Sequence, residues 1–461
     1  MKHLYFILTI LLVCTWNTLP AKVPTLKLIT LQLIPDHTDF LYKTGEKVNF
    51  KVAALRCGMP LDNIEIRYEI SEDMMKPHKA GTTQIKNGTV EINAGTMKQE
   101  GFLRCHVYTK YQGVEYSGVS TVGFSPEKLR PVTTLPDDFF DFWNTNKVEA
   151  KKCPLKPLMT LLPEKCTDKV NVYHISFQNN VNGSRIYGTL CIPKLPGKYP
   201  AILKVPGAGI RAYNGEIERS ARGFIILEIG IHGIPVNMPG TIYRDLYAGA
   251  LKDYYFFNLS NRDNYYYKRV YTGCMRAIDF IYTLPQFNGT LGTFGGSQGG
   301  ALSLITAGLD KRVKAVVSFY PALCDLAGYT KNRAGGWPHI FKENGNQTPK
   351  KLQVASYYDT VNFARQITVP VFCSFGYNDM TCPPTTTYSA YNVINSPKEL
   401  FIAENTSHYT YPEQMDIAWK QGRRIKNYCS VKVVTNIFHP IRLLVFSDSY
   451  FLLLFYPSLV W

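Results

Sequence analysis

Residues 295–299 read Gly295-Gly296-Ser297-Gln298-Gly299 and join two apolar stretches of different character. The short run Leu291 to Phe294 before them is typical of a buried strand, and Gly300 to Leu309 after them, rich in Ala, Leu and Ile, is typical of a helix. A serine between glycines at a strand-to-helix junction indicates a sharp, strained turn on which the hydroxyl is exposed. This feature requires a sheet layered with helices.

The rest of the chain from Pro136 to Trp419 supports that prediction, because strand-like and helix-like runs alternate in it. We expect an α/β fold with a doubly wound, mostly parallel sheet over residues 136–419. Its expected strands are nearly continuous apolar runs, as buried parallel strands should be. Besides residues 291–294 they are Ala201 to Val205, Phe224 to Ile229, Val313 to Phe319, Val369 to Phe375 and Leu400 to Ala403, with a helix over Asn264 to Leu284.

Residues 23–124 differ, since short alternating runs broken by turn residues predict a small antiparallel, Ig-like all-β sandwich. The expected strands are Lys47 to Ala53, Ile64 to Ile70, Thr89 to Ile92, Phe102 to Tyr108 and Ser117 to Val122. Nothing in this part groups a nucleophile, a base and an acid, so we interpret it as an accessory domain. Residues 125–135, with Pro126 and Pro131, form the expected linker.

The first 21 residues are typical of a secretory signal peptide, with Lys2 before the apolar run Leu4 to Val13 and a cleavage point near Ala21. We therefore expect an exported protein, periplasmic or extracellular. A lipid anchor on Cys14 is the weaker alternative, because Val13 stands where a small residue is usual.

The last residues, 420–461, form an atypical tail where a final amphipathic helix is expected. Ile441 to Trp461 is apolar, but Arg442, Asp448 and Pro457 make it a poor membrane span. Our hypothesis is a frameshifted or read-through end. An intact peptide covering Val445 to Trp461, recovered from the native producer, would contradict it.

The net charge of +16 is spread along the chain, without a basic arm or a zinc-knuckle spacing, so we expect no nucleic-acid partner. The cysteines show no CxxC pair, and we expect no metal. Cys57 and Cys105 stand in similar strand-like stretches, Leu55-Arg56-Cys57 and Leu103-Arg104-Cys105. They either bridge two sheets or are two free buried thiols.

A serine hydroxyl needs a base and an acid to become a nucleophile, and in this fold acid and histidine follow the serine, each after a later strand. His408 follows Leu400 to Ala403, and Asp379 is the only carboxylate in the loop after Val369 to Phe375. Ser297, Asp379 and His408 are therefore the expected catalytic triad. His339 follows no strand, so with Trp337 it either lines a pocket or has a structural role.

The negatively charged oxygen of the transition state needs two donors, and one should be the backbone N–H of Gln298. The other should come from the loop Val205-Pro206-Gly207-Ala208-Gly209, with the amide of Ala208 or Gly209 as candidate. His232 is a candidate for lining the same cleft.

With these residues, the chain resembles the acetyl xylan esterases and cephalosporin C deacetylases of carbohydrate esterase family seven over roughly Pro136 to Ala418. The resemblance is carried by Leu135-Pro136-Asp137-Asp138-Phe139-Phe140-Asp141-Phe142-Trp143, by the serine turn, and by Gly376-Tyr377-Asn378-Asp379 and His408-Tyr409. Asp263-Asn264-Tyr265-Tyr266-Tyr267 and Ala322-Leu323-Cys324-Asp325 are similar to a branch from gut and soil bacteria that has an N-terminal sandwich. The resemblance implies an α/β-hydrolase that removes acetyl groups from xylan-derived or other acetylated sugars without a cofactor.

Three positions depart from the family pattern. His232-Gly233-Ile234 replaces a common Arg-Gly-Gln, Ala208 stands where a tyrosine often serves the oxyanion hole, and Tyr409 replaces a usual Glu. Because of these departures, the resemblance does not carry over the family's substrate range or its ring-like assembly. A homo-oligomer of some form stays one option.

Two other functions stay open. A prolyl-oligopeptidase-like serine peptidase would share the sheet and the triad, but about a hundred sandwich residues cannot form the usual propeller. A carbohydrate-binding protein without catalysis would not need an intact triad. The sequons at Asn288 and Asn405, the latter beside His408, favour a bacterial producer that does not glycosylate them.

Overall fold

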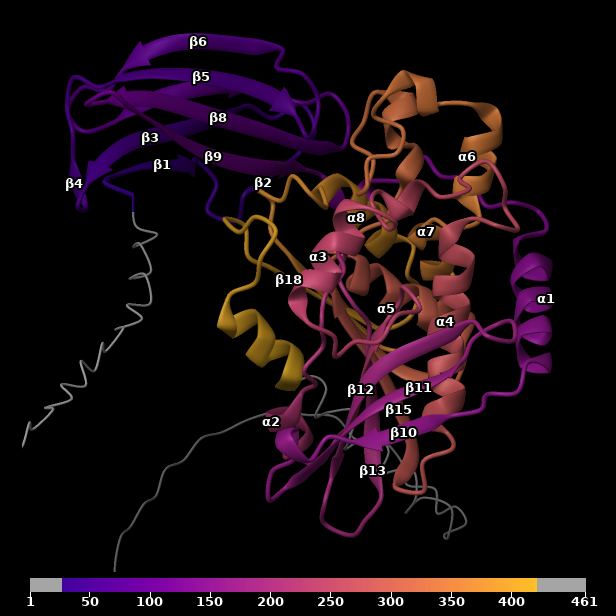
Figure 1. Ribbon diagram of the computed structural model, residues 1–461. Coiled ribbons are helices and arrows are strands. Elements are labelled where there is room, and N and C mark those ends of the chain that lie inside the picture. The colour runs from indigo at the N-terminus through magenta and orange to yellow at the C-terminus, as the bar shows by residue number, and fades with distance from the viewer. Residues whose placement is uncertain (1–26, 421–461) are drawn as a thin grey trace, which may run out of the picture.

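The computed structural model describes residues 27–420, which form a sandwich of strands followed by a larger domain of sheet and helices (Figure 1). The expectations for the signal peptide, Cys14 and residues 421–461 lie outside this range. Among the residues described, no helix is long and apolar enough to cross a membrane.

The sandwich consists of a four-stranded and a five-stranded sheet. The strands are β1 (Ile29–Pro35), β2 (Leu41–Tyr42), β3 (Val48–Arg56), β4 (Met59–Pro60), β5 (Glu65–Glu72), β6 (Lys79–Gln84), β7 (Val90–Gly95), β8 (Gly101–Tyr111) and β9 (Val114–Phe124). One sheet has the order β1-β3-β4 with β7 beside β3, and the other has the order β2-β9-β8-β5-β6. The short β2 runs parallel to β9, so the expected antiparallel arrangement holds for every pair except this one.

The core of the sandwich lies between the two sheets, where alternate residues of each strand meet. Val48, Phe50 and Val52 of β3 point inward with Leu103 and Val107 of β8. This alternation made the strands recognisable in the sequence. The four strands that were not predicted include the edge strand β6, which has no buried residue and is held by its backbone pairing with β5.

Cys57 and Cys105 are both free, so the expected disulfide option is wrong. Cys105 is buried within β8, whereas Cys57 lies just after β3 and is exposed, which also corrects the alternative of two buried thiols.

The larger domain contains a nine-stranded sheet in the order β10-β11-β12-β14-β13-β15-β16-β17-β18. Its strands are β10 (Leu158–Leu161), β11 (Val170–Gln178), β12 (Arg185–Pro193), β13 (Tyr199–Lys204), β14 (Ile225–Gly230), β15 (Phe287–Gly296), β16 (Val313–Phe319), β17 (Val371–Phe375) and β18 (Lys398–Ile402). All pairs from β14 to β18 are parallel, and β10, β11 and β12 add an antiparallel edge that was not predicted.

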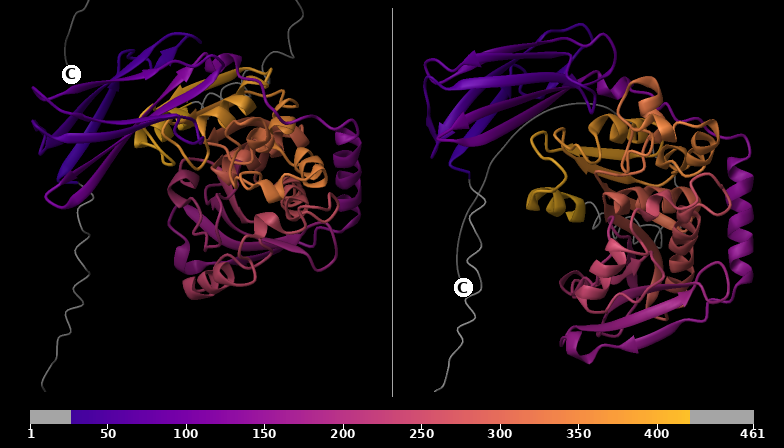
Figure 2. Two further views of the ribbon diagram at one scale, coloured as in Figure 1. Left: turned by 90° about the horizontal axis from the view of Figure 1, so that it is seen from above. Right: turned by 45° about the horizontal axis from the view of Figure 1, so that its top comes forward.

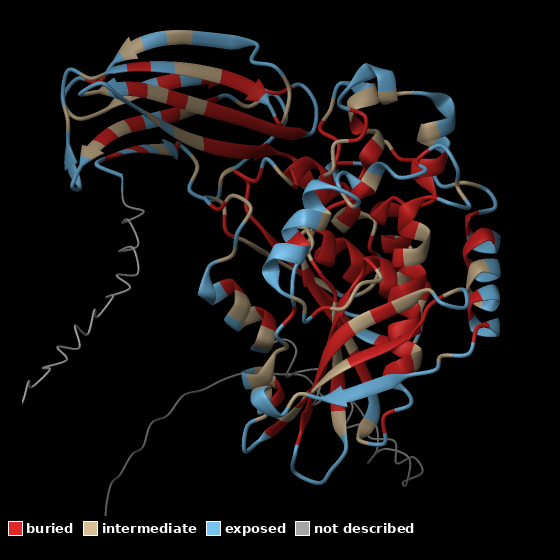
Figure 3. Ribbon diagram, in the orientation of Figure 1, coloured by how far each residue is buried: buried red, intermediate tan, exposed pale blue. Residues whose placement is uncertain are grey.

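The helices are α1 (Phe139–Lys152), α2 (Ile217–Ser220), α3 (Gly240–Ala248), α4 (Tyr266–Ile281), α5 (Gln298–Leu309), α6 (Pro349–Ser356), α7 (Thr360–Ala364) and α8 (Pro384–Asn392), with 3-10 turns at Pro126–Lys128, Pro163–Lys165, Tyr254–Phe256, Leu326–Lys331 and Asn344–Asn346. One face of the sheet packs against α1, α4, α5 and α7 in the main hydrophobic core. The other face meets α2 and the helical residues 412–420, where Trp419 stacks on Phe294. Figure 3 shows the central strands buried between these layers.

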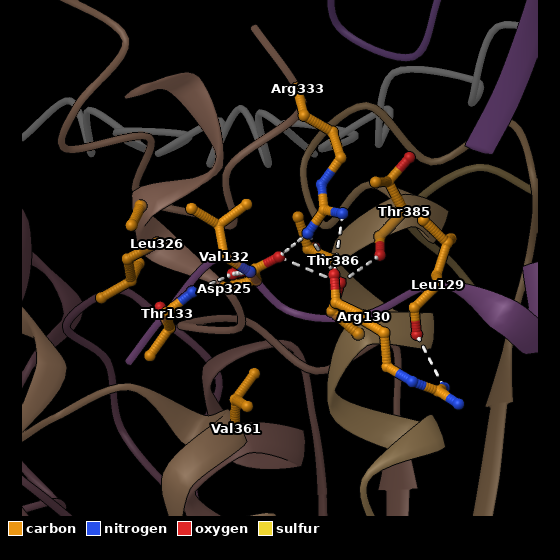
Figure 4. A network of polar contacts seen from close by, with 12 residues as sticks. Leu129, Arg130, Val132, Thr133, Asp325, Leu326, Arg333, Val361, Thr385 and Thr386 are labelled. Carbon is orange, nitrogen blue, oxygen red and sulfur yellow. Dashed lines mark hydrogen bonds and ion pairs between the residues drawn. The ribbon is translucent and has the colours of Figure 1, made fainter. Parts of the chain in front are cut away.

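The linker 125–135 is held against the larger domain by polar contacts (Figure 4). The backbone N–H groups of Val132 and Thr133 donate to one carboxylate oxygen of Asp325 at 2.8 and 2.9 Å, and Arg333 pairs with the other oxygen. The Thr133 hydroxyl donates to Asp359 at 2.6 Å. The linker therefore has a defined path, and both views of Figure 2 show the sandwich beside the C-terminal part of the larger domain.

Candidate active site

Ser297 occupies the turn between β15 and α5, at the carboxyl edge of the parallel strands. Its backbone has a φ of 59° and a ψ of −126°, a strained conformation for a residue with a side chain. The glycines are needed on both sides, because a Cβ on Gly295 would lie 2.4 Å from backbone atoms of Gly299, and a Cβ on Gly299 would lie 2.4 Å from the carbonyl oxygen of Val205. Strand, turn and helix are thus packed too closely for larger residues.

The structure brings together the three residues that the sequence places far apart. Nε2 of His408 lies 3.0 Å from Oγ of Ser297, and Nδ1 of His408 lies 2.8 Å from Oδ2 of Asp379. Both distances are those of hydrogen bonds. A proton can pass from the hydroxyl to the imidazole while the carboxylate fixes the other ring nitrogen.

The acid is held inside the protein, and the histidine reaches the surface. Asp379 has no exposed surface, and its Oδ1 accepts hydrogen bonds from the backbone N–H groups of Thr381 and Cys382, each at 2.8 Å. The acid loop is also joined to the histidine loop, since Asn378 N–H donates to the carbonyl of Thr406 at 3.1 Å. These contacts leave Oδ2 directed at the imidazole.

Gln298 ties the serine turn to its surroundings through a side chain whose role the sequence did not show. Its Oε1 accepts from the hydroxyls of Tyr254 and Tyr267 at 2.6 and 2.9 Å, and its Nε2 donates to the carbonyl of Pro206 at 3.2 Å. This places the loop of residues 205–209 directly against the turn. Gln298 is the first residue of α5, so no carbonyl of an earlier helical turn can accept a hydrogen bond from its backbone N–H.

The two candidates in the loop differ in what surrounds them. The carbonyl of Gly209 accepts from Nε2 of His232 at 3.2 Å. Burial raises the pKa of Tyr254 far above its usual value, and a backbone hydrogen bond from Gly209 acts in the opposite direction. The amides of Ala208 and Gly209 therefore both remain candidates for the second donor.

The expected pocket residues lie around this site in different ways. His232 is buried behind the loop and does not face solvent. His339 is half-buried, with Nδ1 bonded to the hydroxyl of Tyr329 at 2.9 Å and the carbonyl of Gly335 at 3.0 Å. Trp337 is also half-buried and packs edge-on against Tyr255, with ring centroids 5.1 Å apart. Trp337 thus packs against a segment far away in the sequence, whereas His339 is held by neighbours within ten residues.

Tyr320 is a neighbour of the triad that sequence reasoning missed. Its ring centroid lies 4.6 Å from that of His408, and its N–H donates to the carbonyl of Ser374 at 2.9 Å. The available signal was its position directly after the predicted strand Val313 to Phe319, at the same edge of the sheet. Among residues 27–420, no three His, Cys, Asp or Glu side chains are grouped so that they could hold a metal ion.

Comparison with known proteins decides the family. Residues 126–422 match the model of the acetyl xylan esterase family. The chain is also 43% identical over 421 residues to the acetyl esterase Axe7A of Xylanibacter ruminicola, covering 90% of this chain and 94% of that protein.

The chain belongs to the acetyl xylan esterase family.

It is therefore a carboxylic-ester hydrolase, which decides against the peptidase and the non-catalytic binding protein. The solved acetyl xylan esterase of Paenibacillus sp. R4 is similar at 25% identity with a TM-score of 0.56, covering 66% of this chain and 98% of that one. The acetyl xylan esterase 1 of Thermoanaerobacterium sp. matches in fold, at 24% identity and a TM-score of 0.55, covering 65% of this chain and 97% of that one. The α/β-hydrolase fold is thereby confirmed, and the two sheets formed by β1 to β9 confirm the N-terminal sandwich. The match to Axe7A is longer than residues 126–461, so it extends into the sandwich.

His232 contacts the loop of residues 205–209, the candidate oxyanion loop, and its pKa is shifted. Nδ1 of His232 lies 2.7 Å from the hydroxyl of Tyr266, and Nε2 faces the carbonyl of Gly209. Because a carbonyl only accepts, Nε2 carries the proton and Nδ1 accepts from the tyrosine. Burial lowers the pKa of His232 from 6.5 to about 4, and the charges of Arg269 and Arg211 act in the same direction.

We expect the esterase to lose stability as the pH falls from about 6.5 to about 4, because the unfolded chain then binds a proton at His232 that the folded chain does not. The contribution of this group is at most about 3 kcal/mol. In His232→Gln, whose amide can donate to Gly209 and accept from Tyr266, the free energy of unfolding should depend less on pH. Urea denaturation at pH steps across this range measures the difference, and parallel curves for both proteins would contradict the assignment.

Proposed function

We propose that this protein is an exported serine esterase that removes acetyl groups from acetylated carbohydrates through an acyl-enzyme. The observation that carries the proposal is the arrangement of Ser297, His408 and Asp379, in which one imidazole lies within hydrogen-bond distance of both partners. Its two nitrogens then have distinct roles, one toward the nucleophile and one toward the acid.

The reaction proceeds in two halves. Oγ of Ser297 attacks the acetyl carbonyl while Nε2 of His408 takes its proton, and the same proton then goes to the departing sugar hydroxyl. Water, deprotonated by His408, attacks the acetyl-serine and releases acetate. In both halves the backbone N–H groups of Gln298 and of Ala208 or Gly209 donate to the oxygen that gains negative charge.

The substrate class is inferred from relatives named as acetyl esterase and acetyl xylan esterase, and from side chains beside the triad. Met380 and Tyr409 directly follow Asp379 and His408, and both are about half exposed, at 47% and 48%. Tyr411 packs edge-on against Tyr409, with ring centroids 5.8 Å apart, and is also exposed. Exposed apolar side chains around a reactive serine are suited to contact a sugar ring.

A substrate panel tests the proposal. The esterase should hydrolyse acetylated xylo-oligosaccharides and 4-nitrophenyl acetate, and lose rate as the acyl chain lengthens. Rapid hydrolysis of long-chain esters with none of acetylated sugars would overturn the substrate class while leaving the esterase intact.

Tyr409→Ala should raise KM for acetylated xylo-oligosaccharides about 3- to 10-fold, because loss of one aromatic contact costs about 1 kcal/mol. Its kcat/KM for 4-nitrophenyl acetate, which has no sugar, should stay within about twofold. Tyr282→Ala is the matched control, because Tyr282 is a tyrosine of similar exposure, 42%, that lies away from the site. It follows the end of α4, whereas the start of that helix is the end near the site, where Tyr267 contacts Gln298. Equal changes of KM on both substrates would contradict a sugar contact at Tyr409.

Export is proposed from residues 1–21, with cleavage near Ala21 and a lipid on Cys14 as the weaker alternative. The exposed Asn405 stands beside His408, and its side chain donates to Tyr411 at 3.2 Å, so a glycan there would crowd the site. We therefore expect a bacterial producer. The N-terminal sequence and mass of the mature protein test cleavage and lipidation, and an occupied glycan on Asn405 of active enzyme would contradict the bacterial assignment.

A further inference from the structure

The end of β8 nearest the catalytic domain is buried on both faces, unlike an ordinary strand of a sandwich. Residues Gly101 to Cys105 are all buried, and Figure 3 shows the corresponding ends of β8 and β9 in red. Leu103 and Cys105 point into the core of the sandwich, whereas Phe102 packs with Tyr377 and Tyr388 of the catalytic domain. Arg104, two residues along from Phe102, shares its face and is 1% exposed.

A buried guanidinium requires a partner, and Arg104 has an acidic one from its own domain. Its Nη2 lies 2.7 Å from Oδ1 of Asp73, whose side chain is also buried. The other oxygen of Asp73 accepts from the hydroxyl and the N–H of Thr385, at 2.8 and 3.3 Å, in the first turn of α8. The ion pair therefore bridges the sandwich and the catalytic domain.

The same nitrogen of Arg104 reaches the acid loop. It lies 3.4 Å from the carbonyl oxygens of both Tyr377 and Asp379. Between them, Nδ2 of Asn378 donates to the carbonyl of Val119 in β9 at 3.4 Å. Three consecutive residues of the catalytic domain, ending at the acid of the triad, are thus contacted by the sandwich.

The charges of Arg104, Asp73 and Asp379 also act on one another. Burial raises the pKa of Asp73, the charge of Arg104 lowers it, and the carboxylate of Asp379 raises it again. The two carboxylates are therefore near enough to repel, and the guanidinium is paired with one of them while it contacts the backbone of the other.

We propose that Arg104 is a positioning residue of the esterase reaction. Through the carbonyls of Tyr377 and Asp379 it fixes the loop that aims the acid at His408, which makes the sandwich part of the catalytic unit. The proposal rests on the proposed function, in which Asp379 orients the imidazole. A displacement of about 1 Å in such a group can cost about 100-fold in rate.

The test separates positioning from stability. Removing Arg104 alone leaves the carboxylate of Asp73 buried without a cation, so the main variant is Asp73→Asn with Arg104→Met, which removes both charges and keeps a similar volume. We expect this folded variant to lose about 10- to 100-fold in kcat for 4-nitrophenyl acetate, with KM within about threefold. The rate at which a fluorophosphonate labels Ser297 should fall in parallel, and Arg104→Lys should be intermediate.

Arg276→Met is the matched control. Arg276 is 5% exposed, pairs with Asp279 at 2.7 Å and donates to the carbonyl of Cys153 at 2.7 Å, without contact to the triad loops. Its kcat should stay within about twofold whatever its Tm. A double variant whose kcat and labelling rate equal those of the wild type would show that Arg104 is only structural. An inactive wild-type protein would instead overturn the proposed function itself.

Discussion

Ser297→Ala should lower kcat for 4-nitrophenyl acetate and for acetylated xylo-oligosaccharides by about four to six orders of magnitude. The expected loss is large because the hydroxyl forms the bond to the acetyl group and lies within hydrogen-bond distance of Nε2 of His408. KM should change little, since an alanine at the turn removes only the oxygen.

The structure also predicts that Ser297→Ala folds normally. The backbone around residue 297 is held by its N–H to Phe319 and by its carbonyl to Ala301 and Ala322, at 3.0 to 3.1 Å, and none of these bonds uses the side chain. Circular dichroism and Tm should therefore match the wild type, while labelling by a fluorophosphonate disappears. Near-normal turnover by this variant, after purification that excludes contaminating esterases, would end the assignment of the nucleophile.

Asp379→Asn should lower kcat by about four orders of magnitude, although the shape of the side chain is kept. The reason lies in the two N–H groups, of Thr381 and Cys382, that face Oδ1. An asparagine must direct its carbonyl oxygen at them, which turns its NH₂ toward Nδ1 of His408. The imidazole then carries its proton on Nε2 and cannot accept one from Ser297.

Kinetics at rising pH measure this effect. In the variant, hydroxide can take the serine proton in place of the imidazole, so the rate should increase with pH beyond the point at which the wild type levels off. Asp310→Asn is a control at another carboxylate of the same domain, whose side chain is 12% exposed, pairs with Arg312 and does not contact the triad. An Asp379→Asn enzyme with wild-type kcat would show that the imidazole is oriented by another group.

Much of the site was predictable because α/β topology repeats a simple rule. The carboxyl ends of parallel strands meet at one edge, so residues following β15, β17 and β18 had to lie near one another once those strands were recognised. Ser297, Asp379 and His408 each follow such a strand. Tyr320 follows β16 in the same way, but a tyrosine has no required place in the chemistry, so its position alone did not single it out.

Other parts of the site depend on distances that no local pattern encodes. The glycines at 295 and 299 predicted close packing, but the bonds from Tyr254 and Tyr267 to the side chain of Gln298 join segments more than thirty residues apart. His232 looked like a residue of the cleft because of its place after a strand. Its burial behind Gly209 depends on the path of residues 205–209, which contain glycines and can fold back in several ways.

The tripeptide Leu-Arg-Cys occurs at residues 55–57 and 103–105. Its two copies show what the sequence determined and what only the tertiary structure decided. By itself the sequence determined that both belong to a small sandwich, because alternation with period two requires only a strand with one buried face. The tertiary structure alone decided that Arg56 lies exposed at the end of β3, while Arg104 is buried against the acid loop. The physical reason is that burial of the second face depends on a domain whose contact begins some 270 residues later in the chain.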